Sequence, residues 1–217
     1  CKIYIEILQS NTSMRKLIVL TSLVLVALPV LYNSSYTGNM VYDKDEIDIP
    51  VSIHLADDGT IQFTTDKDIK DIYGIFDEVN RIWGQAQIKF FIEDIDTVKI
   101  DNSEFNPVFT GNLDSLTKRD DFDNGMINGY FARYISANGV SFPPQGIFVV
   151  GDITSVKDFR ATAHELGHLL GLHHIDDRDY LMSSGNNGET LIEDEIDIAR
   201  KNVSKGKNRN ADRSCAY

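Results

Sequence analysis

Two histidines and a glutamate in one short stretch have the types and spacing needed to bind and use a metal ion. His164 and His168 lie four residues apart, so on an α-helix their imidazoles share one face and can reach one cation. Glu165 is placed to hydrogen-bond a water molecule on that cation and to act as its general base. A catalytic zinc ion takes three protein ligands and keeps one position for water. The pair therefore needs a third ligand from elsewhere in the chain.

A third ligand requires the helix to end soon after His168. A continued helix turns by about 100° per residue, which would point a residue roughly nine or ten positions after His164 away from the metal. Gly171 stands where the chain must turn, because glycine adopts the left-handed conformation that ends helices. Beyond this helix-breaking turn, His174 can come back under the metal. We therefore expect one catalytic zinc ion bound by His164, His168 and His174.

The stretch resembles the extended zinc signature of the metzincin metalloproteases at all five specified positions, which are His164, Glu165, His168, Gly171 and His174. Four of the five histidines in the chain fall within this stretch, which argues against a chance match. Metzincins also carry a methionine turn below the metal, and residues 180–183 look like it. Met182 follows His174 by eight residues, a short spacing similar to that of the matrixin branch.

The resemblance implies an α+β fold, that of a metzincin-like (zincin) catalytic domain. Such a domain has a twisted, mostly parallel sheet with an antiparallel edge strand, an active-site helix and a small C-terminal subdomain. It also implies a zinc endopeptidase, in which a zinc-bound water activated by Glu165 hydrolyses peptide bonds of a peptide or protein substrate. Met182 would form the apolar floor below the metal.

Two other interpretations of the motif stay open. In a gluzincin the two histidines are completed by a downstream glutamate, such as Glu189 or Glu193, which would leave Gly171 and His174 without a role. The chain could instead be a zinc-binding adhesion or inhibitor module that kept the motif and lost activity, although Glu165 is present. Zinc titration with an assay on an unfolded protein such as casein separates these classes.

Composition suits one catalytic domain. The chain has 217 residues, of which 42% are hydrophobic, enough for one sizeable core. The net charge of −12 argues against nucleic acid or an anionic membrane surface as a partner, because phosphate groups reward clustered Lys and Arg. The two cysteines, Cys1 and Cys215, lie at opposite ends, so disulfides provide no framework. We expect a monomer.

The N-terminal region has the pattern of an export signal. A positive start at Arg15 and Lys16 precedes an apolar run at residues 17–31, as in a signal peptide or an N-terminal membrane anchor. We expect a protein that is secreted, or anchored with its catalytic domain outside the cytoplasm. The expected organisation is a discounted extension at 1–13, the leader at 14–32, a linker at 33–46, the catalytic domain at 47–204 and a basic tail at 205–217.

Strands are predicted from apolar runs at residues 47–55, 88–92, 126–135 and 147–150. Residues 128–132 resemble a metzincin strand, in which Gly129 replaces the expected β-branched residue. Residues 94–114 are rich in turn residues and predict irregular structure. By resemblance, residues 136–146 form the upper rim of the cleft, where an edge strand pairs with extended substrate.

Three helices are predicted. The first covers residues 66–85, with a buried stripe made of Ile69, Ile72, Tyr73, Phe76, Val79, Ile82 and Trp83. The active-site helix starts near Ser155 or Asp158 and ends at Gly171. A capping box at Thr190 and Glu193 opens the last helix.

Two further metal sites are weaker hypotheses. The acidic run at residues 120–125 could bind calcium, because hard cations take clustered oxygen ligands, but an acidic surface turn explains it better. His54 has no neighbouring histidine or cysteine, so we expect a structural role for it.

The leader generates the first prediction. Expressed with residues 14–35 intact, the protein should be recovered outside the cytoplasm or in the membrane fraction, because a basic start followed by an apolar run directs export. Deletion of that segment should leave a soluble cytoplasmic domain that still binds zinc. Cell fractionation with metal analysis measures both, and a full-length protein that stays soluble in the cytoplasm would contradict the prediction.

Overall fold

The computed structural model describes residues 45–105, 108 and 110–214. The chain divides into two units, Cys1–Lys44 and Asp45–Tyr217, and the described residues all belong to the second. The predicted extension, the leader at 14–32 with its possible anchor at 17–31, and nearly all of the predicted linker lie outside the described residues. Within the described part of the chain, no helix is both long and apolar enough to cross a membrane.

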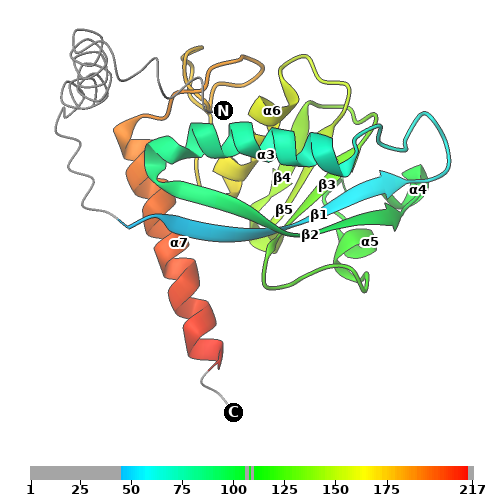
Figure 1. Ribbon diagram of the computed structural model, residues 1–217, viewed down its shortest axis with the longest axis horizontal. Coiled ribbons are helices and arrows are strands. Elements are labelled where there is room, and N and C mark those ends of the chain that lie inside the picture. Colours follow the sequence, from blue (N-terminus) through cyan, green and yellow to red (C-terminus); the bar gives the residue numbers. More distant parts are fainter. Residues whose placement is uncertain (1–44, 106–107, 109, 215–217) are drawn as a thin grey trace, which may run out of the picture. The chain divides into compact units, whose positions relative to one another are not determined.

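A five-stranded sheet in the order β2-β1-β3-β5-β4 forms the centre of the second unit (Figure 1). Its strands are β1 (Ile47–Asp57), β2 (Ile88–Lys99), β3 (Ile127–Ala132), β4 (Gly139–Phe142) and β5 (Ile147–Gly151). All neighbours are parallel except β4, which pairs antiparallel with β5 at one edge. The α+β class and the mostly parallel sheet with an antiparallel edge strand, as predicted, are therefore confirmed.

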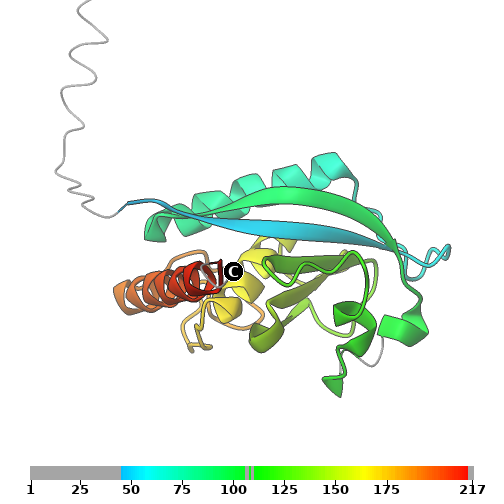
Figure 2. The ribbon, with the colours of Figure 1, turned by 90° about the horizontal axis from the view of Figure 1, so that it is seen from below.

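Helix α3 (Ile69–Trp83) connects β1 to β2 and packs along them (Figure 2). It starts with a capping box, in which the Asp71 amide donates to the Asp68 side chain and the Asp68 amide to that of Asp71. The predicted apolar stripe is buried except for Ile69 and Tyr73, which are 57% and 53% exposed. Both residues project from one edge of the stripe, so that part of the prediction was wrong.

Residues of the central strands alternate between the two faces of the sheet, as the period of a strand requires. Phe131 and Phe148 face the core that also contains α3 and α6 (Asp158–Leu169). Tyr130 and Val149 face a second core, closed by the short helices α4 (Asn102–Phe105) and α5 (Asp114–Thr117). The short 3-10 helices η1 (Gly84–Ala86) and η3 (Pro143–Gln145) lead into β2 and β5.

The structure differs from the sequence-based expectation at β2. This strand continues to Lys99, through the stretch predicted to be irregular from residue 94, because it pairs with β1 along its whole length. As the edge strand it can keep acidic side chains in solvent while its backbone is paired.

Two further differences concern α7 (Glu193–Ser214). The helix extends to Ser214, well past residue 205, where a frayed tail was expected. The predicted capping box at Thr190 is wrong, because the helix begins only at Glu193 and Thr190 forms a β-bridge with Tyr180 instead. The side chain of Glu195 accepts the amide of Ile192 at the start of the helix.

Gly129 is explained by its neighbour in the sheet. It pairs in register with Phe148 of β5, and a Cβ at position 129 would overlap the Phe148 ring. A β-branched residue, as in the metzincin strand that this segment resembles, could not fit unless the ring moved. The departure from the family pattern is therefore compensated by the aromatic side chain on β5.

We predict that Gly129→Val destabilises the fold by about 1–3 kcal/mol, the usual cost of overpacking a filled core. Gly74→Ala is the matched control, because Gly74 lies exposed within α3 and a Cβ there has no neighbour within 4 Å. The control should stabilise the protein by about 0.5–1 kcal/mol through helix propensity. Urea unfolding followed by circular dichroism measures both changes, and equal stability of Gly129→Val and the parent would refute the packing argument.

Candidate metal centre

Helix α6 carries His164, Glu165 and His168 through the interior of the domain, and its residues from Arg160 to Gly167 are all buried. It starts at Asp158, within the predicted region, and its N-cap Lys157 provides no side-chain cap. The Lys157 amide instead donates to the Asn187 side chain at 3.0 Å. The Trp83 indole at the end of α3 donates to the Ala163 carbonyl at 3.2 Å, which fixes the position of α6 relative to α3 next to His164.

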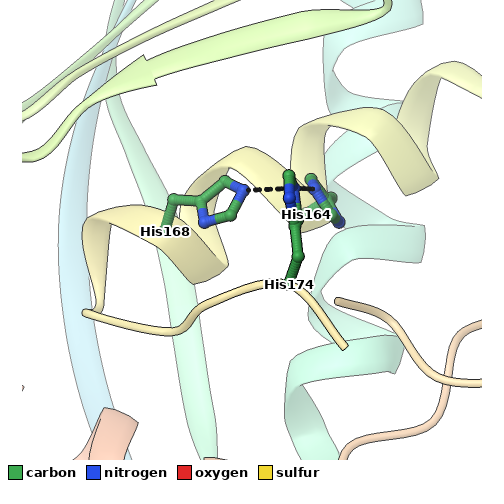
Figure 3. A group of neighbouring side chains, drawn as sticks. All are labelled: His164, His168 and His174. Carbon is green, nitrogen blue, oxygen red and sulfur yellow. Dashed lines mark hydrogen bonds between the residues drawn. The ribbon is translucent and has the colours of Figure 1, made fainter. Parts of the chain in front are cut away.

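The helix ends just after His168, where the third ligand requires it. Leu170 is the C-cap, and Gly171 has φ +88°, in the left-handed region that favours glycine. The Gly171 amide donates to the His168 carbonyl at 2.9 Å and the Leu172 amide to the Gly167 carbonyl at 3.0 Å, which is the Schellman arrangement. The chain then reverses and brings His174 back beneath α6 (Figure 3).

The three predicted ligands converge on one point (Figure 3). The Nε2 atom of His174 lies 3.1 Å from Nε2 of His164 and 3.1 Å from Nε2 of His168. The Nδ1 atoms of His164 and His168 lie 2.8 and 2.9 Å from the carbonyl oxygens of Leu181 and Leu172. A carbonyl can only accept, so Nδ1 carries the proton in both rings and each Nε2 offers a lone pair.

These lone pairs are the test of whether a metal ion fits. A proton on Nε2 of His174 could be donated to one neighbour only, so the lone pair of the other histidine would be left without a donor. A shared cation satisfies all three lone pairs, and tetrahedral zinc–imidazole bonds place the nitrogens about 3.3 Å apart. His164, His168 and His174 therefore fit a metal ion. His164 and His168 also donate their other ring N–H to a backbone carbonyl, as metal-binding histidines usually do.

His164 and His168 stand in the protonation state that a metal requires. Burial is the main cause that lowers the pKa of His164 to about 3, and the charge of Arg160 acts in the same direction. The hydrogen bond to Leu181 opposes this shift. Burial also lowers the pKa of His168. Neutral imidazoles can bind a cation without first losing a proton.

Glu165 points into the same site and is only 7% exposed. Burial raises the pKa of its carboxyl to about 7, although a hydrogen bond from Ser141 and the charge of Arg160 act in the opposite direction. Gly139 on β4 makes room for this side chain, because a Cβ there would lie 2.7 Å from Cγ of Glu165. The edge strand thus presses directly on the carboxylate, a contact that the sequence did not indicate.

Met182 lies buried under α6, where the sequence predicted a methionine turn. A Cβ at Gly167 would lie 2.5 Å from Sδ of Met182, so the missing side chain lets the turn approach the helix. The Ile175 amide donates to the Met182 carbonyl at 3.1 Å, which joins the segment after His174 to the turn. Met182 thus supports the third ligand through the backbone as well as through packing.

Arg160 is the main residue that the sequence analysis missed. It lies one helical turn before His164 and donates to the carbonyls of Gly188, Leu181 and Ser183. It thereby ties α6 to the methionine turn. Its position four residues before His164 was the available signal, but nothing in the sequence showed which backbone atoms it would meet.

The other candidates do not join the site. Glu189 is paired with Arg81 at 2.6 Å and Lys157 at 3.5 Å, and Glu193 is exposed at the start of α7, so neither gluzincin ligand lies with the histidines. His173 is exposed. His54 is buried and lies 3.0 Å from the Asn128 side chain, in the structural role expected.

The acidic run at residues 120–125 lies beside Asp94 and Asp96, around a cavity of about 470 Å³. Clustered carboxylates on a surface are common in acidic proteins and do not by themselves indicate a cation. The calcium hypothesis is unsupported.

A cavity of about 790 Å³ opens over the metal site. One wall is formed by residues 137–141 and Pro143, and the floor by α6 from Arg160 to His168. Residues 171–174 and 184–185 close the remaining sides. The three histidines and Glu165 are thus reachable from solvent through one cleft that runs beside the edge strand β4.

No protein-family model matches the sequence, and no curated protein matches it significantly. Among solved structures, the chain is similar to an archaemetzincin from Methanopyrus kandleri, with a TM-score of 0.52 and 14% identity over 76% of this chain and 99% of that one. It is also similar to a chain in a chaperone–substrate complex, with a TM-score of 0.55 and 14% identity over 75% of this chain and 35% of that one. At such identities the likeness concerns the fold alone, and that fold is shared with an archaemetzincin.

The geometry allows a choice between the two adjacent histidines. We predict that His174→Ala removes or greatly weakens zinc binding, because only His174 completes the cluster. His173→Ala is the matched control and should lose at most the roughly 10- to 100-fold in affinity typical of an outer partner. Metal stoichiometry of the purified variants is the measurement. The reverse result would show that the register after Gly171 is wrong.

Proposed function

We propose that the protein is a zinc metalloendopeptidase of the metzincin type. One observation carries the proposal: three imidazole lone pairs converge beside a buried carboxylate in the floor of an open cleft. The arrangement has the parts of metal-assisted peptide hydrolysis and needs no separate nucleophilic side chain. The shared fold with an archaemetzincin supports the broader class of zinc peptidase.

Each residue has a definite task in this proposal. His164, His168 and His174 hold the zinc ion, and two of them are kept in position by carbonyl bonds. When bound, zinc supplies a positive charge that polarises a peptide carbonyl and makes a water molecule more acidic. Glu165 accepts a proton from the attacking water and delivers it to the leaving amine nitrogen.

The edge strand β4 offers the means of binding an extended peptide. It pairs with β5 on one side and ends the sheet on the other, beside the cleft. A peptide that adds to this edge gains main-chain hydrogen bonds whatever its side chains are. It would run past Gly139 and Ser141, directly over Glu165.

Two finer points belong to the proposal. The eight-residue spacing from His174 to Met182 supports a matrixin-like arrangement of the methionine turn. The basic start and the apolar run at residues 17–31 support action outside the cytoplasm, as a secreted or membrane-anchored enzyme.

The proposal predicts that Glu165→Gln keeps zinc but loses about 10²- to 10⁴-fold of its kcat on casein, the usual contribution of a general base. The glutamine fills nearly the same space beside Gly139 but cannot accept the proton. Glu193→Gln is the matched control, since Glu193 is exposed at the start of α7 and should change neither property.

Zinc content and casein hydrolysis of the same preparations are the measurements. Appreciable activity of zinc-loaded Glu165→Gln would refute the assignment of the base. Loss of zinc in Glu193→Gln would instead revive the gluzincin interpretation.

A further inference from the structure

Arg160 is a buried cation in the floor of the cleft, and no chemical step is assigned to it. Arg160 is only 2% exposed, yet it lines the cavity together with His164 and Glu165. A buried guanidinium stays charged, because its pKa remains far above neutrality, and it is costly unless that charge is compensated. What compensates Arg160 is therefore a question about function.

The hydrogen bonds of Arg160 can be counted. Nε donates to the Gly188 carbonyl at 3.2 Å, and the two N–H groups of Nη2 donate to the carbonyls of Leu181 and Ser183. These three acceptors are uncharged. Among the residues that the structure describes, none accepts from Nη1, so two N–H groups are left for the cavity that Arg160 lines.

No carboxylate in the described part of the chain forms an ion pair with Arg160. Glu189, the acidic residue of the adjacent loop, is committed to Arg81 and Lys157. Glu165 feels the charge of Arg160 but takes its hydrogen bond from Ser141. Burial lowers the pKa of Arg160 from its usual value, and the charges of Glu165 and Glu189 only oppose this shift from a distance.

We propose that Arg160 binds a carboxylate of the peptide substrate, at a subsite next to the scissile bond. The inference rests on the proposed peptidase function and adds to it a substrate class: peptides with Asp, Glu or a chain-end carboxylate at that position. An arginine is suited to this because its N–H groups form charge-assisted bonds to carboxylate oxygens. Nη2 is already committed, so Nη1 makes the contact.

The position of the subsite follows from a shared acceptor. The Leu181 carbonyl lies 2.6 Å from Nη2 of Arg160 and 2.8 Å from Nδ1 of His164. Arg160 is thus one helical turn from His164, and it contacts Ser183, next to residues 184–185 of the cavity lining. A peptide whose carbonyl carbon lies at the metal would place a neighbouring residue over Nη1.

The expected effect is a preference of about 10- to 100-fold in kcat/KM for Glu over Gln at that position, the range for a hydrogen bond to a charged group. The net charge of −12 acts against acidic substrates at long range, so the preference must come from this local contact. It should therefore survive at moderate salt, where surface fields are screened.

The test uses the zinc-loaded protein and short peptides with Glu, Gln or Ala at each position flanking a cleaved bond. In a second set of peptides, the residue after the cleaved bond is the last residue, and its C-terminus is either a free carboxylate or an amide. This set separates recognition of a side-chain carboxylate from recognition of a chain-end carboxylate. Arg160→Gln should abolish the preference and Arg160→Lys should keep part of it. Arg133→Gln, which removes an exposed arginine paired with Asp66, is the matched control and should leave the preference intact.

Peptide binding to the metal-free protein, measured by calorimetry, provides a readout that does not need catalysis. The wild type should bind Glu peptides about tenfold more tightly than Gln peptides, and this readout decides the question if Arg160→Gln fails to fold. Cleavage without any acidic preference, or with a preference for basic residues, would overturn the subsite and leave the peptidase proposal standing. Binding of carboxylate peptides that depends on Arg160, without cleavage of any peptide, would support the subsite and overturn the peptidase proposal.

Discussion

The Leu181 carbonyl oxygen is the atom that joins helix α6 to the segment below it in the candidate metal centre. It accepts hydrogen bonds from His164 and Arg160, both on α6, while its own residue belongs to the methionine turn. A single helix can present only two imidazoles to one cation, so the third must come from a segment that is fixed against the helix from outside. The bond to Leu181 fixes that segment and, in the same contact, sets the tautomer of the first ligand.

The charge of Arg160 acts on two of the titratable groups that the proposed chemistry needs, His164 and Glu165. It helps to hold His164 neutral and opposes the rise that burial causes in the pKa of Glu165. Metal binding requires neutral imidazoles, and a general base requires an ionised carboxylate. One buried guanidinium therefore favours both states, which gives the site a use for a charge that would otherwise only cost stability.

The sequence contained the local part of this structure. The apolar periods indicated α3 and the central strands, and the spacing from His164 to His174 indicated which three histidines converge and the break at Gly171. These features depend on residues close together in the chain. Over such short distances, the spacing of two residues determines whether their side chains point the same way.

The sequence did not contain the long-range part. Whether Asp94 and its neighbours continue β2 depends on pairing with β1, which no local pattern reveals. The partners of Arg160 are backbone carbonyls more than twenty residues away. Every residue has a backbone carbonyl, so the residue types do not show which ones will accept. The burial of Glu165 by β4 likewise depends on a contact with Gly139, far from it in the sequence, which no local pattern reveals.

Close approach at the site is achieved by leaving side chains out. Gly139 leaves space for Glu165, Gly167 leaves space for Met182, and the Asn202 amide lies where a Cβ of Gly171 would be. That amide also donates to the Leu170 carbonyl at 2.9 Å, so α7 caps the end of α6. A glycine within α6 costs about 1 kcal/mol of helix stability. The packing of the methionine turn offsets this cost, because Met182 can then lie directly beneath the residue that precedes His168. Helix α6 is thus less stable by itself at Gly167, where Met182 packs against it. The turn that contains Met182 also positions His174, through the hydrogen bond from the Ile175 amide to the Met182 carbonyl.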